Sequence, residues 1–131
     1  LTWVVAVEDL AAVETRLGRP AVDGHRTKPD GTDLTWKQIG VLGTLEDRQM
    51  PFFVQWIKNH HPSSDGTAVA KIVKIEIAGD ELAISEWLGS KVKAAIGSGI
   101  EVEWVSTDLN DGDTGIVAVE VETGSGKVRL D

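Results

Sequence analysis

The sequence predicts an α+β fold of two βαβββ units, whose curved sheets of mixed or antiparallel strands form a cup. Segments with an alternating apolar pattern and many β-branched residues recur along the chain, as half-buried strands require. Each half also contains an amphipathic helical segment directly after its first strand. The order strand, helix and three strands therefore occurs twice within 131 residues, a length that suits one compact domain or two very small units sharing a core.

The first half begins with the apolar run TWVVAV at residues 2–7, which predicts a strand. The segment LAAVETRL at 10–17 follows as a helix, with Asp9 as its N-cap and Gly18 just past its end. The sequence PDGTD at 29–33 is a strong turn signal, and it predicts a hairpin between its flanking segments.

The last strand of the first half is expected in PFFVQWI at 51–57, after a loop at 43–50. The polar stretch that follows contains Pro, Ser and Gly and is the best linker candidate. We therefore assign residues 1–57 to unit one, 58–66 to the linker and 67–131 to unit two.

The second half repeats the same order of elements. A helix is expected over 81–88, between Asp80 and Gly89. Its strands are expected at 69–77, 100–105, 115–122 and 127–130.

An offset of 71 positions superimposes the two helical segments. It aligns Asp9 with Asp80, Val13 with Ile84, and Gly18 with Gly89. The match is short, so the alternative is two generic amphipathic helices within one α+β domain; the shared element order favours a true repeat.

Composition limits the classes of function. With 21 acidic and 13 basic residues, the net charge of −8 argues against a nucleic-acid partner. The absence of cysteine excludes disulfides and thiolate sites, and no apolar run approaches the length of a membrane span. No signal peptide is visible, so we expect a cytoplasmic protein with no membrane partner. The start at Leu1 indicates processing, a tag scar or a piece of a longer protein.

A resemblance to a known family rests on several short motifs. They are Arg26, PDG at 29–31, LTW at 34–36, PFFVQW at 51–56, His61-Pro62, Gly79-Asp80 and EWLG at 86–89. As a set these motifs resemble the glyoxalase-like domain proteins of actinobacteria and other bacteria. These belong to the vicinal oxygen chelate superfamily, together with glyoxalase I, extradiol dioxygenases and bleomycin-resistance proteins. The resemblance implies paired βαβββ units around a cup, with another such unit preceding this segment.

The resemblance also implies where a divalent metal would be held, by His on first strands and Glu on last strands. Those positions fall here on Trp3, Gln55, Lys74 and, with weak register, near Arg129. None is a good ligand, so we expect no cofactor in this chain, although a divalent metal in a longer protein stays open. The adjacent His60 and His61 do not have a chelating spacing, and the turn at 110–113 lacks the final acid of a calcium loop.

The expected site is an apolar pocket in the cup. If the helix covers Phe52, Val54 and Trp56, then Phe53 and Gln55 face the cup. Lys74 and Arg129 would add positive charge and favour an anionic ligand. The alternative is that these side chains simply fill the space between the sheets. The candidate ligand-binding residues are Trp3, Trp36, Phe53, Gln55, His61 and Lys74.

Three functions remain open. The first is a small-molecule-binding or non-catalytic portion of a glyoxalase-like protein. The second is a metal-dependent lyase, isomerase or dioxygenase whose ligands come from a missing N-terminal unit or a partner chain. The third is a structural dimerisation unit, since the strand edges of such units are able to pair across a homodimer.

Overall fold

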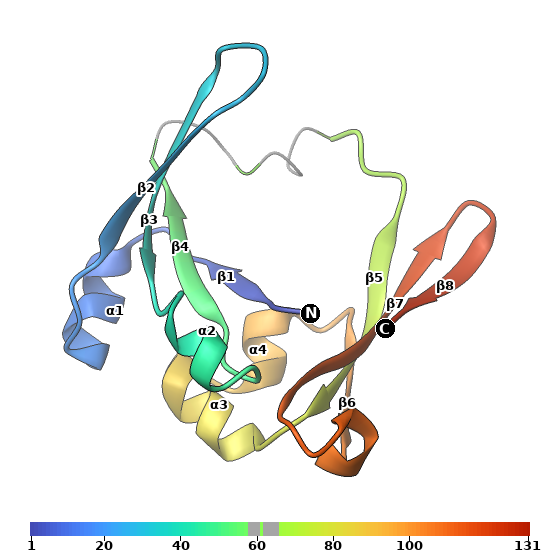
Figure 1. Cartoon of the computed structure of the whole chain (residues 1–131). Helices are drawn as coiled ribbons and strands as arrows, with labels where there is room; N and C mark the ends of the chain where they lie inside the picture. The colour runs from blue at the N-terminus through green and yellow to red at the C-terminus, as the bar shows by residue number, and fades with distance from the viewer. Residues whose placement is uncertain (58–60, 62–65) are drawn as a thin grey trace.

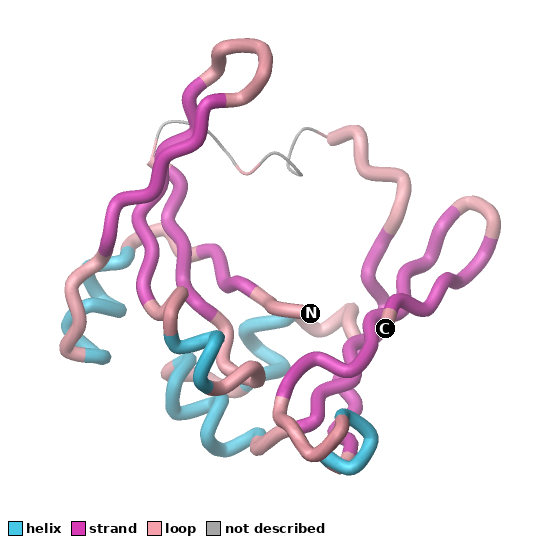
Figure 2. Tube along the Cα trace, viewed as in Figure 1, coloured by secondary structure: helices cyan, strands magenta, loops and turns pink. Residues whose placement is uncertain are grey.

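The computed structural model describes residues 1–57, 61 and 66–131, so most of the expected linker at 58–66 lies outside the described residues. The chain forms two four-stranded sheets; most of the helices lie at the end where the sheets approach each other, and the first helix lies beside the first sheet, away from the second (Figures 1 and 2). We call the first sheet A and the second sheet B. In the described ranges, none of the helices has the length and apolar character needed to cross a membrane.

Sheet A has the strand order β1-β4-β3-β2. Strand β1 pairs in parallel with β4, whereas β4 with β3 and β3 with β2 pair in antiparallel. The predicted hairpin is present, because β2 and β3 flank the turn at 29–33. The strands are β1 (Val4–Ala6), β2 (Val22–Thr27), β3 (Asp33–Ile39) and β4 (Phe52–Trp56).

Sheet B has the order β6-β5-β7-β8. Its first strand lies inside the sheet, parallel to β6 and antiparallel to β7, whereas the first strand of sheet A lies at an edge. The two halves thus share their element order but not their strand order. The strands are β5 (Lys71–Ala78), β6 (Glu101–Val105), β7 (Gly115–Thr123) and β8 (Gly126–Leu130).

Both predicted helices are confirmed, with the predicted caps. The carboxylate of Asp9 accepts from the N–H of Ala11 at the start of α1 (Leu10–Leu17), and Asp80 accepts from Leu82 at the start of α3 (Glu81–Leu88). Each helix ends at a glycine with positive φ, a conformation that L-residues with a Cβ rarely adopt.

Three short helices complete the secondary structure of the described residues. They are α2 (Gly43–Glu46), inside the expected loop at 43–50, α4 (Val92–Ile96) and the 3₁₀ helix η2 (Thr107–Asn110).

One hydrophobic core joins the two halves. It contains Leu10 and Val13 of α1, Phe53 of β4, Ile77 of β5 and Ile84 of α3. The ring of Trp87 on α3 lies 5.9 Å from the ring of Phe53, so α3 packs against sheet A as well as its own sheet. Both halves therefore depend on the same buried side chains.

Candidate functional site

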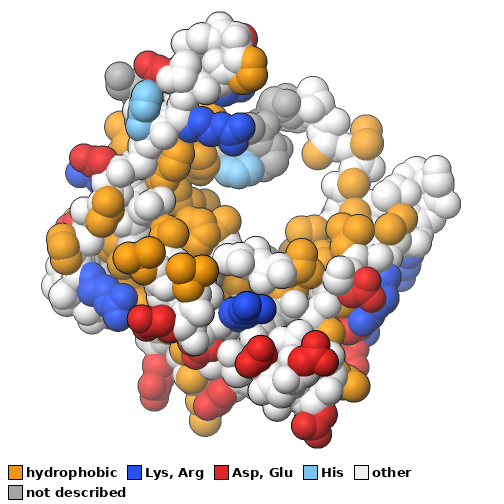
Figure 3. All heavy atoms as spheres, in the orientation of Figure 1, with side chains coloured by type: hydrophobic (Ala, Val, Ile, Leu, Met, Phe, Trp, Pro, Cys, Tyr) orange, Lys and Arg blue, Asp and Glu red, His pale blue; other side chains and the backbone are white. Residues whose placement is uncertain are grey.

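An aromatic surface covers the face of sheet A that is turned away from α1. The rings of Trp36 and Trp56 lie 5.4 Å apart at 52°, and His61 meets Trp56 edge-on at 5.4 Å. Together with neighbouring side chains they line a hollow of about 230 Å³. We call this surface the tryptophan face; its hollow is lined by Val4, Trp36, Gln38, Phe52, Val54, Trp56 and His61. Figure 3 shows hydrophobic side chains gathered in the hollowed centre of the molecule.

Cross-strand neighbours position Trp36 on this face. Trp36 pairs with Gly24 on one side and with Trp56 on the other. A Cβ at position 24 would overlap the indole of Trp36, so glycine leaves the space in which this ring lies. The indole N–H of Trp36 donates to Oε1 of Gln38 at 2.8 Å, which fixes the ring along the strand.

Two donors on this face have no acceptor within the part of the chain that the structure describes. The indole Nε1 of Trp56 is buried and makes no hydrogen bond there. Gln38 uses its carboxamide oxygen on Trp36, and its NH₂ group has no acceptor among the described residues. Nε1 of Trp56 is the unusual one of the two, because native proteins rarely leave a buried donor unpaired once it has lost its bonds to water.

The tryptophan face carries no negative charge on its strands. Strand pairing places Arg26 opposite Leu34, on the same side as Trp36, and Arg26 is the one charged strand residue on this face. The carboxylates of Asp23 and Asp33 lie on the other face, because side chains alternate along a strand.

The expected orientation of the last strand of unit one is wrong. Phe53 is 2% exposed in the core against the helices, and Oε1 of Gln55 accepts from the N–H of Leu10 at 3.0 Å, at the start of α1. The helix therefore covers Phe53 and Gln55, and the more apolar set Phe52, Val54 and Trp56 faces the cup. The polar side chain of Gln55 is able to lie under α1 because its carboxamide oxygen accepts a hydrogen bond from the N–H of Leu10.

The other candidate residues of the first half fall into two groups. Trp36 and His61 line the hollow. Trp3 packs against the core, and its indole N–H donates to the backbone oxygen of Gln49 at 2.8 Å. Trp3 thus belongs to the packing around the core and does not line the hollow.

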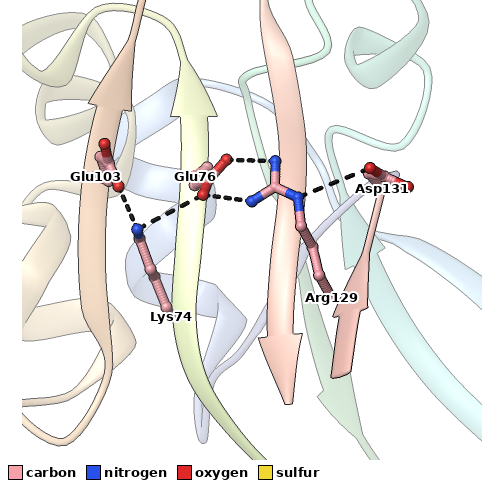
Figure 4. Close-up of polar contacts among 5 residues, drawn as sticks. All are labelled: Lys74, Glu76, Glu103, Arg129 and Asp131. Carbon is pink, nitrogen blue, oxygen red and sulfur yellow. Dashed lines mark hydrogen bonds and ion pairs between the residues drawn. The ribbon is translucent and has the colours of Figure 1, made fainter. Parts of the chain in front are cut away.

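Lys74 and Arg129 lie on the polar face of sheet B, in a row of ion pairs (Figure 4). Lys74 contacts Glu103 and Glu76, and Arg129 donates to both oxygens of Glu76 at 2.5 and 2.8 Å. These bonds from Arg129 hold the pKa of Glu76 below its ordinary value, and the bond to Glu103 raises the pKa of Lys74. Both cations are already paired, so the expected positive charge for a ligand is not available from them.

The positions implied for a metal do not fit one. Trp3 has no ligating atom, Gln55 uses its oxygen on α1, and Lys74 is a paired cation. Within residues 1–57, 61 and 66–131, no three His, Asp or Glu side chains are grouped as metal ligands. The chemistry of the tryptophan face is therefore that of apolar contact and hydrogen-bond donation.

A polar cluster beside the core connects the two halves. Gln49 is 6% exposed; its Nε2 donates to Asp47 at 2.8 Å, and its Oε1 accepts from the N–H of Asp80 at 2.7 Å. Asp47 also accepts from the hydroxyl of Thr114 at 2.6 Å. Burial alone would raise the pKa of Asp47, but the bonds from Gln49 and Thr114 outweigh it and leave that pKa below its ordinary value.

The α+β fold with two mixed four-stranded sheets is consistent with a glyoxalase-like chain. The family model described as "Glyoxalase-like domain" matches residues 1–92, which span sheet A, β5 and α3. The chain belongs to this family, as the resemblance in the motifs predicted, and is consistent with the vicinal oxygen chelate superfamily. The curated proteins and the solved structures compared with the chain gave no match.

Sequence reasoning missed five of the residues that line the hollow, which are Val4, Gln38, Phe52, Val54 and Trp56. Gln38 and Trp56 were assigned no role in binding, because alternation identifies shared faces but not which face meets a helix. The sequence held no local signal for this orientation, because the bond from the N–H of Leu10 to Gln55 joins residues 45 positions apart.

Proposed function

We propose that this glyoxalase-like chain binds a small, flat, mostly apolar molecule on its tryptophan face, without a metal site of its own. The observation that carries the proposal is the orientation of β4. The helices cover the less apolar side of this strand, and two tryptophans remain on the side that lines the hollow. An apolar face that is not used for packing commonly marks an interaction site.

The energetics favour a planar ligand. Two tilted indoles and an edge-on imidazole provide ring faces and edges, against which aromatic molecules pack well. Removing about 100 Å² of apolar surface from water contributes roughly 2.5 kcal/mol. Contacts of this size produce weak to moderate binding of a fragment-sized molecule, which solution methods measure readily.

The five tryptophans supply a test, because each indole N–H gives its own peak in a ¹H–¹⁵N spectrum. Planar aromatic compounds are titrated into the uniformly ¹⁵N-labelled chain. We expect the peaks of Trp36 and Trp56 to shift. The peaks of Trp3 and Trp87 should stay, because both indoles lie outside the lining of the hollow, with their N–H groups bonded to the backbone oxygens of Gln49 and Pro51.

A matched pair of variants assigns the effect to the site. Trp56→Ala should abolish the titration, whereas Leu45→Ala, at a side chain that is 78% exposed on α2, should leave it unchanged. Shifts confined to Trp3 or Trp87, or no saturable shift with any compound, would show that the tryptophan face is not a binding site.

A further inference from the structure

We infer that the tryptophan face selects a small aromatic carboxylate, with the ring against Trp36 and Trp56 and the carboxylate between the donors of Gln38 and Trp56, on a face whose charged strand residue is Arg26. This inference rests on the function proposed above and names the class of its ligand. It follows from hydrogen-bonding groups and charge on a face that is otherwise apolar.

The orientation of Gln38 is set by its neighbour. An indole N–H only donates, so the carboxamide atom 2.8 Å from Nε1 of Trp36 is the oxygen. The NH₂ group is then the free end of this side chain, and no described residue accepts from it. Gln38 therefore offers donors to the hollow, and a ligand at this point should offer an acceptor.

Trp56 supplies the second donor. Gln38 pairs with Val54, so Trp56 is its diagonal neighbour on the next strand, at a typical separation of roughly 7–8 Å. The two oxygens of one carboxylate, each with its own hydrogen bond, are able to bridge side chains at that distance. Nε1 of Trp56 is closed to solvent, so an acceptor reaches it only when the neighbouring side chains shift; the acceptor would then provide the partner that this group lacks among the described residues.

Charge favours an anion over a neutral acceptor. Arg26 shares the face with Trp36, and the strands of sheet A place no carboxylate on that face. Arg26 is not among the residues that line the hollow, so it favours an anion there through its charge, and the hydrogen bonds that Gln38 and Trp56 donate to an ionised acceptor are stronger than those to a neutral one.

The size of the hollow suits one ring with one polar substituent. An apolar cavity of about 150 Å³ is sufficient for benzene. The hollow has about 230 Å³, which leaves room for a carboxylate beside the ring.

The experiment compares benzoate with toluene, which has a ring of the same size without an acceptor, by titration of the full chain with the indole peaks as readout. Benzoate should bind about tenfold or more tightly than toluene, the factor expected for one hydrogen bond to a charged group. The peak of Trp56 should move downfield with benzoate and not with toluene, because its N–H gains an acceptor.

Variants separate recognition of the carboxylate from packing of the ring. Gln38→Glu keeps an oxygen for Trp36 and replaces the free donor with a second anionic oxygen; it should lower benzoate affinity more than tenfold and leave toluene binding unchanged. Arg26→Gln should lower benzoate affinity, and Lys37→Gln, which removes a cation from the opposite face of the same sheet, should not. Trp56→Phe should keep the ring contact and lose the preference for benzoate.

The outcomes distinguish this inference from the proposed function. If toluene and benzoate shift Trp36 and Trp56 with equal affinity, the binding site stands and the carboxylate inference is wrong. If neither probe shifts these peaks at millimolar concentration, both proposals fail. If Arg26→Gln and Lys37→Gln weaken benzoate equally, the effect is one of net charge, and recognition at this face is refuted.

Discussion

Replacing Gln49 with alanine should loosen the connection between the two halves of the chain. The side chain of Gln49 is buried and makes one hydrogen bond to Asp47 and one from the N–H of Asp80. Alanine removes both bonds and leaves Asp47 and the backbone of the opposite half without these partners.

The magnitude follows from the type of each bond. The bond to the ionised Asp47, at 2.8 Å, is of the kind worth about 1.5–3 kcal/mol, and the neutral bond from Asp80, at 2.7 Å, about 1 kcal/mol. We expect Gln49→Ala to lower the free energy of unfolding by about 3 kcal/mol. Gln49→Glu should cost at least as much at neutral pH, because it places a second carboxylate beside Asp47.

Urea unfolding followed by tryptophan fluorescence measures this free energy, with Leu45→Ala as the exposed control, which should change it by less than about 0.5 kcal/mol. The deficit of Gln49→Glu should shrink as the pH is lowered, because protonation of either carboxyl removes the repulsion. If Gln49→Ala lowers the free energy of unfolding by less than about 1 kcal/mol, the reasoning is refuted. Water would then replace the two hydrogen bonds of Gln49 with little change in stability.

Three further predictions concern single positions. The pKa of Asp47 is lowered from 3.8, so its contribution to stability should be complete above that pH and lost as the pH falls through the lowered value; Asp47→Asn should flatten the acid limb of a stability–pH curve. Gly24→Ala should displace the ring of Trp36, shift its indole peak and weaken ligand binding at least severalfold, with the fold retained by circular dichroism. Gln55→Leu removes the acceptor for the N–H of Leu10 and should lower the free energy of unfolding by about 1–2 kcal/mol in urea titrations; an unchanged midpoint would contradict the assigned role of this amide.

The elements that sequence predicts best here depend on neighbours in the chain. Asp9 and Gly18 delimit α1 by local hydrogen bonding and a positive φ, and PDGTD at 29–33 forms a turn by the same local chemistry. Such signals do not depend on how distant strands pair. The family resemblance likewise rested on motifs, and the match over residues 1–92 confirms it.

The orientation of the site depended on distant contacts and was not predictable in the same way. Period-2 alternation groups Phe53 with Gln55 and Val54 with Trp56, but both groupings fit a strand with a helix on either side. The choice is made by the bond from Leu10 to Gln55 and by the packing of Trp87 on Phe53, which join residues more than 30 positions apart. The position of β5 between β6 and β7 in sheet B is likewise determined by pairing between strands that are distant in the sequence.

The distribution of carboxylates over sheet A has a kinetic consequence. The whole chain carries a net charge of −8, yet the strands of the tryptophan face hold only Arg26 as a charged group. An approaching anion is therefore repelled at long range and attracted only at contact, and salt screens the first effect at separations beyond a Debye length of about 10 Å at 0.1 M. Moderate salt should speed the association of an anionic ligand, the reverse of the behaviour of a binder with a uniformly basic surface.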